Sequence, residues 1–231
     1  MKMKMLAVFD NDGTICDSQG IEGECYVRAI ENVTGLSLAA LDWTAHEERT
    51  GSAVVRKLLQ GDAAALAKEA AIEREYVRLL EEAQLKFPSE FTPLLGCKQF
   101  LERLKREAEC SVAIATGCFA ASARFKLRCC GIALDELPHA TCSDTPRRGE
   151  IITLAARRAG FELSAVVYFG DGPWDVQASR LLGIPMIGIG RGIDRLGELG
   201  VHHLFRDYSD SDAIIRVLHT LAAQPRSLRP N

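Results

Sequence analysis

The sequence predicts an α/β protein with a doubly wound parallel sheet and a helical segment inserted close to its N-terminus. Three observations carry this prediction. From residue 96 onward, apolar runs of strand length alternate with amphipathic segments of helix length, as in strands joined by crossover helices. Residues 20–91 show charge-rich helical periodicity and no strand-like run. Before them, the short apolar run 6–9 ends abruptly in an acidic turn.

The helical segment divides the chain into two expected units. A small helical domain is expected to span residues 19–91, and the core is expected to combine residues 1–18 with residues 92–231. The stretch where the chain returns to the core is rich in proline and turn residues, as expected for a crossing between units. We expect hinges at the two crossings, near residues 17–20 and 88–96.

Each expected element rests on a local signal. In the insertion, Leu66, Val77 and Leu80 recur at helical spacing among glutamate and arginine residues. In the core, Gly131 and Gly183 follow segments with helical patterns and are expected to end those helices. Short apolar runs between polar stretches predict buried strands. The expected helices cover 63–86, 98–107, 120–130, 150–159, 175–182 and 210–223, and the expected strands cover 6–9, 111–115, 139–142, 165–169 and 186–189.

The composition indicates a globular protein that binds a small molecule. At 231 residues, of which 47% are hydrophobic, the chain can bury a sizeable core. Its formal net charge is −3 and its basic residues are dispersed, which gives no indication of a nucleic-acid partner. The first apolar run meets Asp10 too soon for a signal peptide or a membrane span, and the eight cysteines form no Cys-x-x-Cys pair. We expect a cytoplasmic protein with reduced thiols and no membrane partner, either a monomer or a homodimer.

Two carboxylates, Asp10 and Asp12, directly follow the first apolar run. Residues at i and i+2 of an extended chain point to the same side, so both side chains are expected to share one small volume. At about 4 Å their repulsion is about 1 kcal/mol in water and about 4 kcal/mol at an effective dielectric constant of 20. A cation or a proton is therefore expected between them, and a divalent metal is the simplest candidate. The plainer alternative is a pair of turn or helix-capping aspartates.

The other predicted strands also end in polar residues. Ligands of a doubly wound sheet bind at the carboxyl ends of its strands, so these positions matter most. Thr116 and Gly117 follow the strand 111–115 and offer a hydroxyl and an unobstructed backbone amide to an anion. The strand 165–169 leads into Asp171 and Asp175, and a basic pair stands at a helix entrance between these two motifs. Carboxylates, an anion-binding turn and a cation are therefore expected to converge.

These four motifs, in this order, resemble those of the haloacid dehalogenase superfamily of phosphohydrolases. The first, Asp-x-Asp-x-Thr, is matched by residues 10–14, the second by Thr116, and the fourth, Gly-Asp-x-x-x-Asp, by residues 170–175. The third motif of the family usually offers lysine, whereas the best-placed residue here is Arg148, with Arg147 as its competitor. The helical insertion is similar to the small cap of the phosphoglycolate phosphatase and β-phosphoglucomutase branch, which has a Rossmann-like core.

The resemblance implies a phosphoaspartyl mechanism with Mg²⁺ as the cofactor. Asp10 would attack phosphorus and become the aspartyl-phosphate. Asp12 would protonate the leaving oxygen and then activate water, which requires it to hold a proton at the start. Asp10, the backbone carbonyl of Asp12, and Asp171 would bind the metal, supported by Asp175 from behind. Asp12 also favours phosphoryl transfer over carbon–halogen chemistry, because dehalogenase members of the superfamily lack an aspartate there.

The resemblance also assigns substrate contacts. Thr116, the Gly117 amide and Arg148 would hold the phosphoryl oxygens. The cap of the family carries a specificity loop, and residues 46–52 occupy a comparable place in this chain. Arg49 is therefore a candidate substrate contact. Arg56 is a further but weaker candidate.

Two residues beside these motifs leave alternatives open. Cys118 follows the anion-binding turn, but no histidine is predicted beside it to activate a thiol, so we expect it to have a supporting position. Trp174 either packs against the fourth motif or lines the pocket.

The resemblance predicts a Mg²⁺-dependent phosphatase that acts on a small phosphorylated metabolite beneath a mobile helical cap. A phosphomutase of the β-phosphoglucomutase type is the nearest alternative, since it returns the phosphoryl group to substrate instead of water. A sensor that binds a phosphate ligand without turnover is a third interpretation. The presence of both Asp10 and Asp12 argues against it, because a binding protein needs neither a nucleophile nor an acid.

Overall fold

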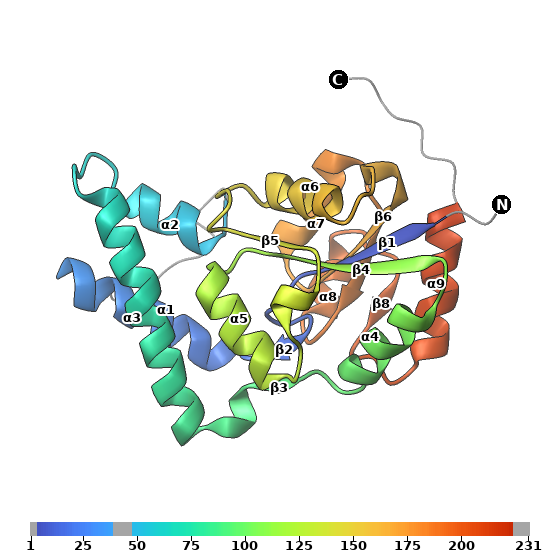
Figure 1. The fold of residues 1–231 in the computed structure, drawn as a ribbon, viewed down its shortest axis with the longest axis horizontal. Helices are drawn as coiled ribbons and strands as arrows, with labels where there is room; N and C mark the ends of the chain where they lie inside the picture. The colour runs from blue at the N-terminus through green and yellow to red at the C-terminus, as the bar shows by residue number, and fades with distance from the viewer. Residues whose placement is uncertain (1–3, 39–47, 224–231) are drawn as a thin grey trace.

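The computed structural model describes residues 4–38 and 48–223 of the chain. Its centre is a six-stranded parallel sheet in the order β5-β4-β1-β6-β7-β8, with helices on both faces (Figure 1). The predicted fold class is confirmed. The strands are β1 Met5–Phe9, β4 Cys110–Thr116, β5 His139–Thr141, β6 Val166–Gly170, β7 Met186–Ile189 and β8 Leu204–Phe205.

The strand β1 lies inside the sheet and is buried on both faces. Because successive side chains of a strand point to opposite sides, Leu6 and Val8 join one hydrophobic core, whereas Met5, Ala7 and Phe9 join the other. The neighbours β4 and β6 pair with it along its length. The chain therefore leaves β1 from a fixed point at the carboxyl edge of the sheet.

Helices cover both faces of the sheet. Side chains of α6 and α7 pack into the first core, and those of α4 and α9 pack into the second. The helices of this part of the chain are α4 Cys97–Arg106, α5 Ala120–Cys129, α6 Arg148–Arg158, α7 Pro173–Leu182, α8 Ile193–Glu198 and α9 Ser211–Ala223, with short 3-10 turns η2 Pro88–Glu90, η3 Leu134–Glu136 and η4 Leu163–Ala165. Among the described helices, none is both long and apolar enough to cross a membrane.

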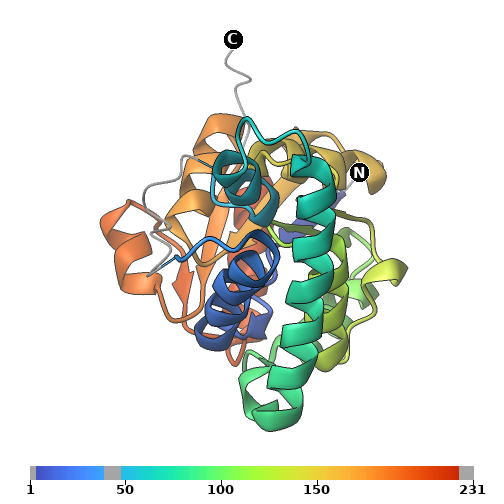
Figure 2. The same cartoon turned by 90° about the vertical axis from the view of Figure 1, so that its left-hand side faces the viewer.

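The inserted segment contributes the helices α1 Gln19–Thr34, α2 Gly51–Leu58 and α3 Ala65–Lys86. In Figure 2, α1 and α3 run side by side over the carboxyl edge of the sheet. Both crossings to the core meet in a small ribbon, where β2 Cys16–Asp17 pairs antiparallel with β3 Thr92–Pro93. The division into two units and the hinges at these crossings remain predictions.

Most expected elements form within a few residues of their predicted ends, and the exceptions have local causes. The helix α7 begins at Pro173, two residues early, because proline suits the first turn and Gly172 occupies the N-cap position. The elements α8 and β8 were not predicted. β8 has only two residues, too few for the alternation that identifies a strand.

Candidate active site

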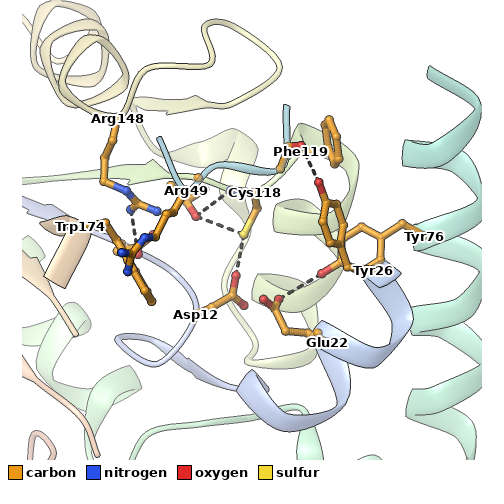
Figure 3. Close-up of a pocket in the computed structure, with 14 residues that line it drawn as sticks. Asp12, Glu22, Tyr26, Arg49, Tyr76, Cys118, Phe119, Arg148 and Trp174 are labelled. Carbon is orange, nitrogen blue, oxygen red and sulfur yellow. Dashed lines mark hydrogen bonds and ion pairs between the residues drawn. The ribbon is translucent and has the colours of Figure 1, made fainter. Parts of the chain in front are cut away.

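A pocket of about 270 Å³ lies at the carboxyl edge of the sheet, beneath the inserted helices (Figure 3). Loops after β1, β4 and β6 form its floor, as the rule for doubly wound sheets predicts. The inserted segment forms the opposite wall. The floor includes Asp10, Asp12, Thr116, Gly117, Cys118 and Arg148, and the opposite wall includes Glu22, Tyr26, Arg49, Gly51 and Tyr76.

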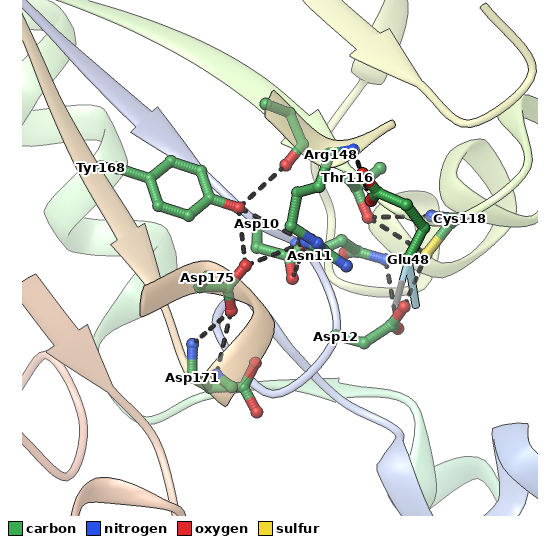
Figure 4. A network of polar contacts seen from close by, with 12 residues as sticks. Asp10, Asn11, Asp12, Glu48, Thr116, Cys118, Arg148, Tyr168, Asp171 and Asp175 are labelled. Atoms are coloured by element: carbon green, nitrogen blue, oxygen red, sulfur yellow. Dashed lines mark hydrogen bonds and ion pairs between the residues drawn. The ribbon is translucent and has the colours of Figure 1, made fainter. Parts of the chain in front are cut away.

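The guanidinium of Arg148 is bound between two carboxylates in the floor (Figure 4). Its Nη1 atom lies 3.0 Å from Oδ2 of Asp10 and 2.9 Å from Oδ1 of Asp175. Burial alone would lower the pKa of Arg148, but the charges of Asp10 and Asp175 hold that pKa well above its usual value. Arg147 is exposed and pairs with Glu150. The structure therefore brings Arg148, and not Arg147, to the pocket.

Asp175 uses both of its carboxylate oxygens to fix the turn after β6. Oδ1 accepts hydrogen bonds from the Tyr168 hydroxyl at 3.0 Å and from Arg148. Oδ2 accepts from the backbone amides of Asp171 at 3.1 Å and Gly172 at 2.9 Å. Burial raises the pKa of Asp175 to about 6, although Arg148 acts in the opposite direction. With four donors on its two oxygens, Asp175 is suited to hold this turn and the guanidinium in place.

Three buried carboxylates, Asp10, Asp171 and Asp175, form an acidic cluster. One oxygen of each lies within 4.8 Å of the others. Carboxylates this close repel one another, and a cation between them relieves the repulsion. The donor set consists of oxygen atoms alone, which is the kind that Mg²⁺ prefers. These residues therefore fit a divalent metal of this type.

Asp12 faces a different set of partners. Oδ1 accepts a hydrogen bond from the Ser18 hydroxyl at 2.9 Å, and Oδ2 lies 2.6 Å from both the Cys118 thiol and the Lys126 ammonium. Lys126 also forms an ion pair with Glu22. Burial alone would raise the pKa of Asp12, but Lys126 and the hydrogen bonds from Cys118 and Ser18 bring it below its usual value. Asp12 therefore favours its ionised form.

The two carboxylates of the first motif diverge, because the chain does not stay extended after β1 (Figure 4). A tight turn follows, in which the carbonyl of Asn11 accepts hydrogen bonds from the backbone amides of Ile15 at 2.7 Å and Cys16 at 2.9 Å. Asp10 joins the acidic cluster of the floor, whereas Asp12 lies in a separate group with Glu22 and Cys118. Both side chains still line the same pocket, but they face different partners because the backbone does not stay extended at these positions.

Each carboxylate of the first motif has its own protein cation. Arg148 binds Asp10 and Lys126 binds Asp12. Two protein cations therefore balance the two carboxylates, and a divalent metal at the first motif stays a prediction. The buried ammonium of Lys126 stabilises the carboxylate form of Asp12 and lowers its pKa, so this environment does not itself supply the starting proton that the acid role requires.

The inserted segment touches the anion-binding turn directly. The backbone amide of Gly51 donates to the carbonyl of Gly117 at 2.8 Å, and the Thr50 hydroxyl donates to the carbonyl of Pro146 at 2.7 Å. Thr116 is buried beside this contact. The inserted helices are thus closed over the floor of the pocket.

Of the two candidate substrate contacts in the inserted segment, Arg49 lines the pocket and Arg56 does not. The Arg49 guanidinium lies 5.6 Å from the ring centre of Trp174, and both residues line the pocket. Both alternatives for Trp174 hold, because its indole packs against Gly172 of the fourth motif and also lines the pocket. Arg56 instead pairs with Glu69 at 2.9 Å and is not among the pocket residues. Residues 46–47 of the loop lie outside the described residues.

Sequence reasoning did not identify several residues of the site, among them Glu22, Tyr76, Lys126 and Tyr168. One feature of the sequence could have identified Lys126 as a buried, paired residue. Lys126 stands four residues after Ser122, on the face of α5 that is buried, where a charged residue needs partners. Tyr168 lies within an apolar strand, and nothing in the sequence shows which residue its hydroxyl contacts.

The fold and the pocket define an α/β enzyme with an acidic site at the carboxyl edge of a parallel sheet, covered by inserted helices. The family model of haloacid dehalogenase-like hydrolases matches residues 4–183. The chain belongs to this family and is an enzyme of the hydrolase class. No curated protein matches the chain.

Solved structures resemble the chain over nearly its whole length. A hydrolase from Pseudomonas syringae is 20% identical, with 93% of this chain and 99% of that chain covered and a TM-score of 0.72. A HAD hydrolase of family IA, variant 3, from Entamoeba histolytica is 17% identical, covering 96% of this chain and 100% of that one, with a TM-score of 0.70. CbbY from Rhodobacter sphaeroides, solved with phosphate, is 17% identical, with 90% of this chain and 96% of that chain covered and a TM-score of 0.67. At these identities the likeness establishes the fold.

Proposed function

We propose that this enzyme is a Mg²⁺-dependent phosphatase that hydrolyses a small phosphate monoester through an aspartyl-phosphate. One observation carries the proposal: the Asp10 carboxylate lies in the pocket floor against the Arg148 guanidinium, which is itself held by Asp175. A nucleophile beside a fixed cation suits attack on a phosphoryl group, because catalysis of phosphoryl transfer depends on positioning and charge stabilisation. The phosphate-bound relative from Rhodobacter sphaeroides supports the same ligand class.

The first step uses Asp10 as the nucleophile. An oxygen of Asp10 forms a bond to phosphorus while the bond from phosphorus to the leaving oxygen breaks, and the departing alcohol takes a proton from Asp12. Because Asp12 favours its ionised form, the proton comes with the substrate. A phosphate monoester has a second pKa near 6, so it can bind as the monoanion and pass its proton through Asp12. Thr116, the Gly117 amide and Arg148 hold the phosphoryl oxygens.

The second step returns the enzyme to its starting state. Asp12 takes a proton from water, the water oxygen bonds to phosphorus, and the bond between phosphorus and Asp10 breaks to release inorganic phosphate. Asp12 then gives this proton to the departing phosphate or to solvent and is ionised again. The lowered pKa of Asp12 leaves it mostly ionised and available as the base. Asp10, Asp171 and the carbonyl of Asp12 would hold Mg²⁺, with Asp175 in support. The metal supplies charge neutralisation at the phosphoryl group.

The pocket favours a compact leaving group. Its volume of about 270 Å³ is below the usual range of sites for drug-sized ligands. Tyr26, Tyr76 and Phe119 give the side next to Asp12 an aromatic surface. A short alcohol therefore fits this pocket better than a nucleotide or a phosphoprotein.

Metal removal tests the proposed function. Purified enzyme is screened for phosphate release from a panel of phosphorylated metabolites, with Mg²⁺ or with EDTA. We expect EDTA to lower the rate by roughly 100-fold or more, because the metal supplies several kcal/mol of charge stabilisation, and added Mg²⁺ should restore it. A phosphomutase would instead yield a phosphorylated isomer of the substrate. The absence of metal-dependent phosphate release from the whole panel would refute the phosphatase proposal.

The Gly117→Ala substitution is expected to weaken phosphate binding by roughly 10- to 100-fold. A Cβ atom at Gly117 would lie 2.5 Å from Nη2 of Arg148, and the guanidinium cannot move away without straining its contacts with Asp10 and Asp175. Losing one charge-assisted hydrogen bond costs about 1.5–3 kcal/mol. Calorimetry with inorganic phosphate and Mg²⁺ measures the effect.

The matched control for this substitution is Gly149→Ala. Gly149 directly follows Arg148 in α6, but its added Cβ would meet nothing closer than Leu182 at 3.9 Å. We expect its phosphate affinity to stay within about twofold of the wild type. If Gly117→Ala and Gly149→Ala bind phosphate with equal affinity, the guanidinium of Arg148 is not part of the phosphate site.

A further inference from the structure

Lys126 is a fully buried charged residue outside the four sequence motifs. It lies on α5, and its side chain is 0% exposed. A buried ammonium is costly unless it is paired, so its partners indicate its role. Its Nζ atom lies 2.6 Å from Oδ2 of Asp12, 3.3 Å from Sγ of Cys118, and 5.9 Å from the ring centre of Tyr76, and it forms an ion pair with Glu22.

These contacts restrain the Asp12 carboxylate from one side. Oδ1 is held by the Ser18 hydroxyl, and Oδ2 is held by Lys126 together with the Cys118 thiol. Among the described residues, Lys126 is the only cation that pairs with Asp12. Without its ammonium, Oδ2 would keep only the thiol, which is a weak donor. The position of the carboxylate therefore depends on Lys126.

The same ammonium also reaches the inserted helices. Glu22 belongs to α1 and Tyr76 to α3, and the Tyr76 hydroxyl donates to Oε2 of Glu22 at 3.1 Å. This oxygen is also the partner of Lys126. The ion pair thus spans the boundary between the core helix α5 and the inserted helices. In this structure it forms with α1 lying over the pocket.

We propose that Lys126 is a positioning residue that holds Asp12 for proton transfer and couples its position to the closed cap through Glu22. The inference rests on the proposed function, since it gives Asp12 the role of acid and base. Lys126 is fully buried and is not among the residues that line the pocket. It acts through Asp12.

The test uses Lys126→Met, which keeps the length of the side chain and removes its charge. The substrate is para-nitrophenyl phosphate, whose leaving group needs no proton to depart. Formation of the aspartyl-phosphate should therefore stay fast, whereas its hydrolysis, which needs Asp12 as base, should slow. We expect kcat to fall by roughly 10- to 100-fold with KM changed less than about threefold. Stopped-flow traces should show a burst of nitrophenolate close to one equivalent of enzyme.

Arg128→Met is the matched control, because Arg128 is an exposed cation on the same helix. It should retain wild-type kinetics without a burst. A merely structural role for Lys126 would lower the melting temperature of Lys126→Met but produce no burst. A folded Lys126→Met variant with kcat within twofold of wild type would overturn the inference. If the wild type itself shows no Mg²⁺-dependent turnover, the proposed function fails first, so the two failures are distinguishable.

Two further variants keep the test decisive. Lys126→Met leaves two carboxylates without their cation and can fail to fold for that reason. The double variant Lys126→Met with Glu22→Gln removes part of this negative charge and should show the same burst of nitrophenolate. Glu22→Gln alone keeps the pair of Lys126 and Asp12 and tests the link to the cap. It is expected to lower kcat/KM by roughly threefold to tenfold. Kinetics of Glu22→Gln identical to wild type would overturn the coupling to the cap.

Discussion

Replacing Asp10 with asparagine is expected to abolish phosphate release while the chain stays folded. The amide oxygen is a poor nucleophile, and removal of a catalytic nucleophile lowers kcat by roughly 10⁴-fold or more. The fold should survive for two reasons. Arg148 keeps its contact with Asp175, and an asparagine oxygen can still accept the backbone amide of Asn11, which now donates to Oδ1 of Asp10 at 2.8 Å. Phosphate release in the presence of Mg²⁺ measures the loss of activity, and circular dichroism measures whether the variant is folded.

The control for Asp10→Asn is Asp135→Asn. Asp135 is exposed and pairs with Arg124, and neither residue lines the pocket, so the same chemical change there should leave the rate within about twofold of wild type. Acid-quenched wild-type enzyme should also carry one phosphoryl group on Asp10, whereas Asp10→Asn should carry none. A folded Asp10→Asn variant with a tenth or more of the wild-type activity would exclude Asp10 as the nucleophile.

The sequence was sufficient for the fold because its strands are buried on both faces. Such strands appear as continuous apolar runs, and the run that became β1 and the run that became β7 were both placed within one residue. The strand β8 and the helix α8 were missed, because their short lengths carry no periodic signal. Local pattern is therefore informative where burial is complete and the element is long.

The site was less predictable than the fold, because its geometry depends on tertiary contacts. Motif order indicated Asp10, Asp171 and Asp175, which the structure brings together. The choice between Arg147 and Arg148 depended on which of the two the start of α6 directs inward, and adjacent residues in a sequence do not reveal that. The partner of Asp12 lies 114 residues away in the sequence, on a helix without a motif.

Replacing Asp12 with asparagine is expected to lower kcat by roughly 10²- to 10⁴-fold, which is the range for loss of a general acid and base. An amide can neither supply the proton to a leaving alcohol nor take one from water. With an alkyl phosphate both steps should slow. With para-nitrophenyl phosphate the first step should persist, so aspartyl-phosphate should accumulate and be detectable by mass spectrometry of the quenched enzyme.

The outcome for Asp12→Asn separates the two carboxylates of the first motif. Asp10→Asn should form no phosphoenzyme with either substrate, whereas Asp12→Asn should trap it. Because Lys126 keeps its ion pair with Glu22 in the Asp12→Asn variant, the buried ammonium stays compensated and the fold should persist. A loss of turnover would then reflect proton transfer and not unfolding. Wild-type turnover of an alkyl phosphate by Asp12→Asn would show that another group moves the proton.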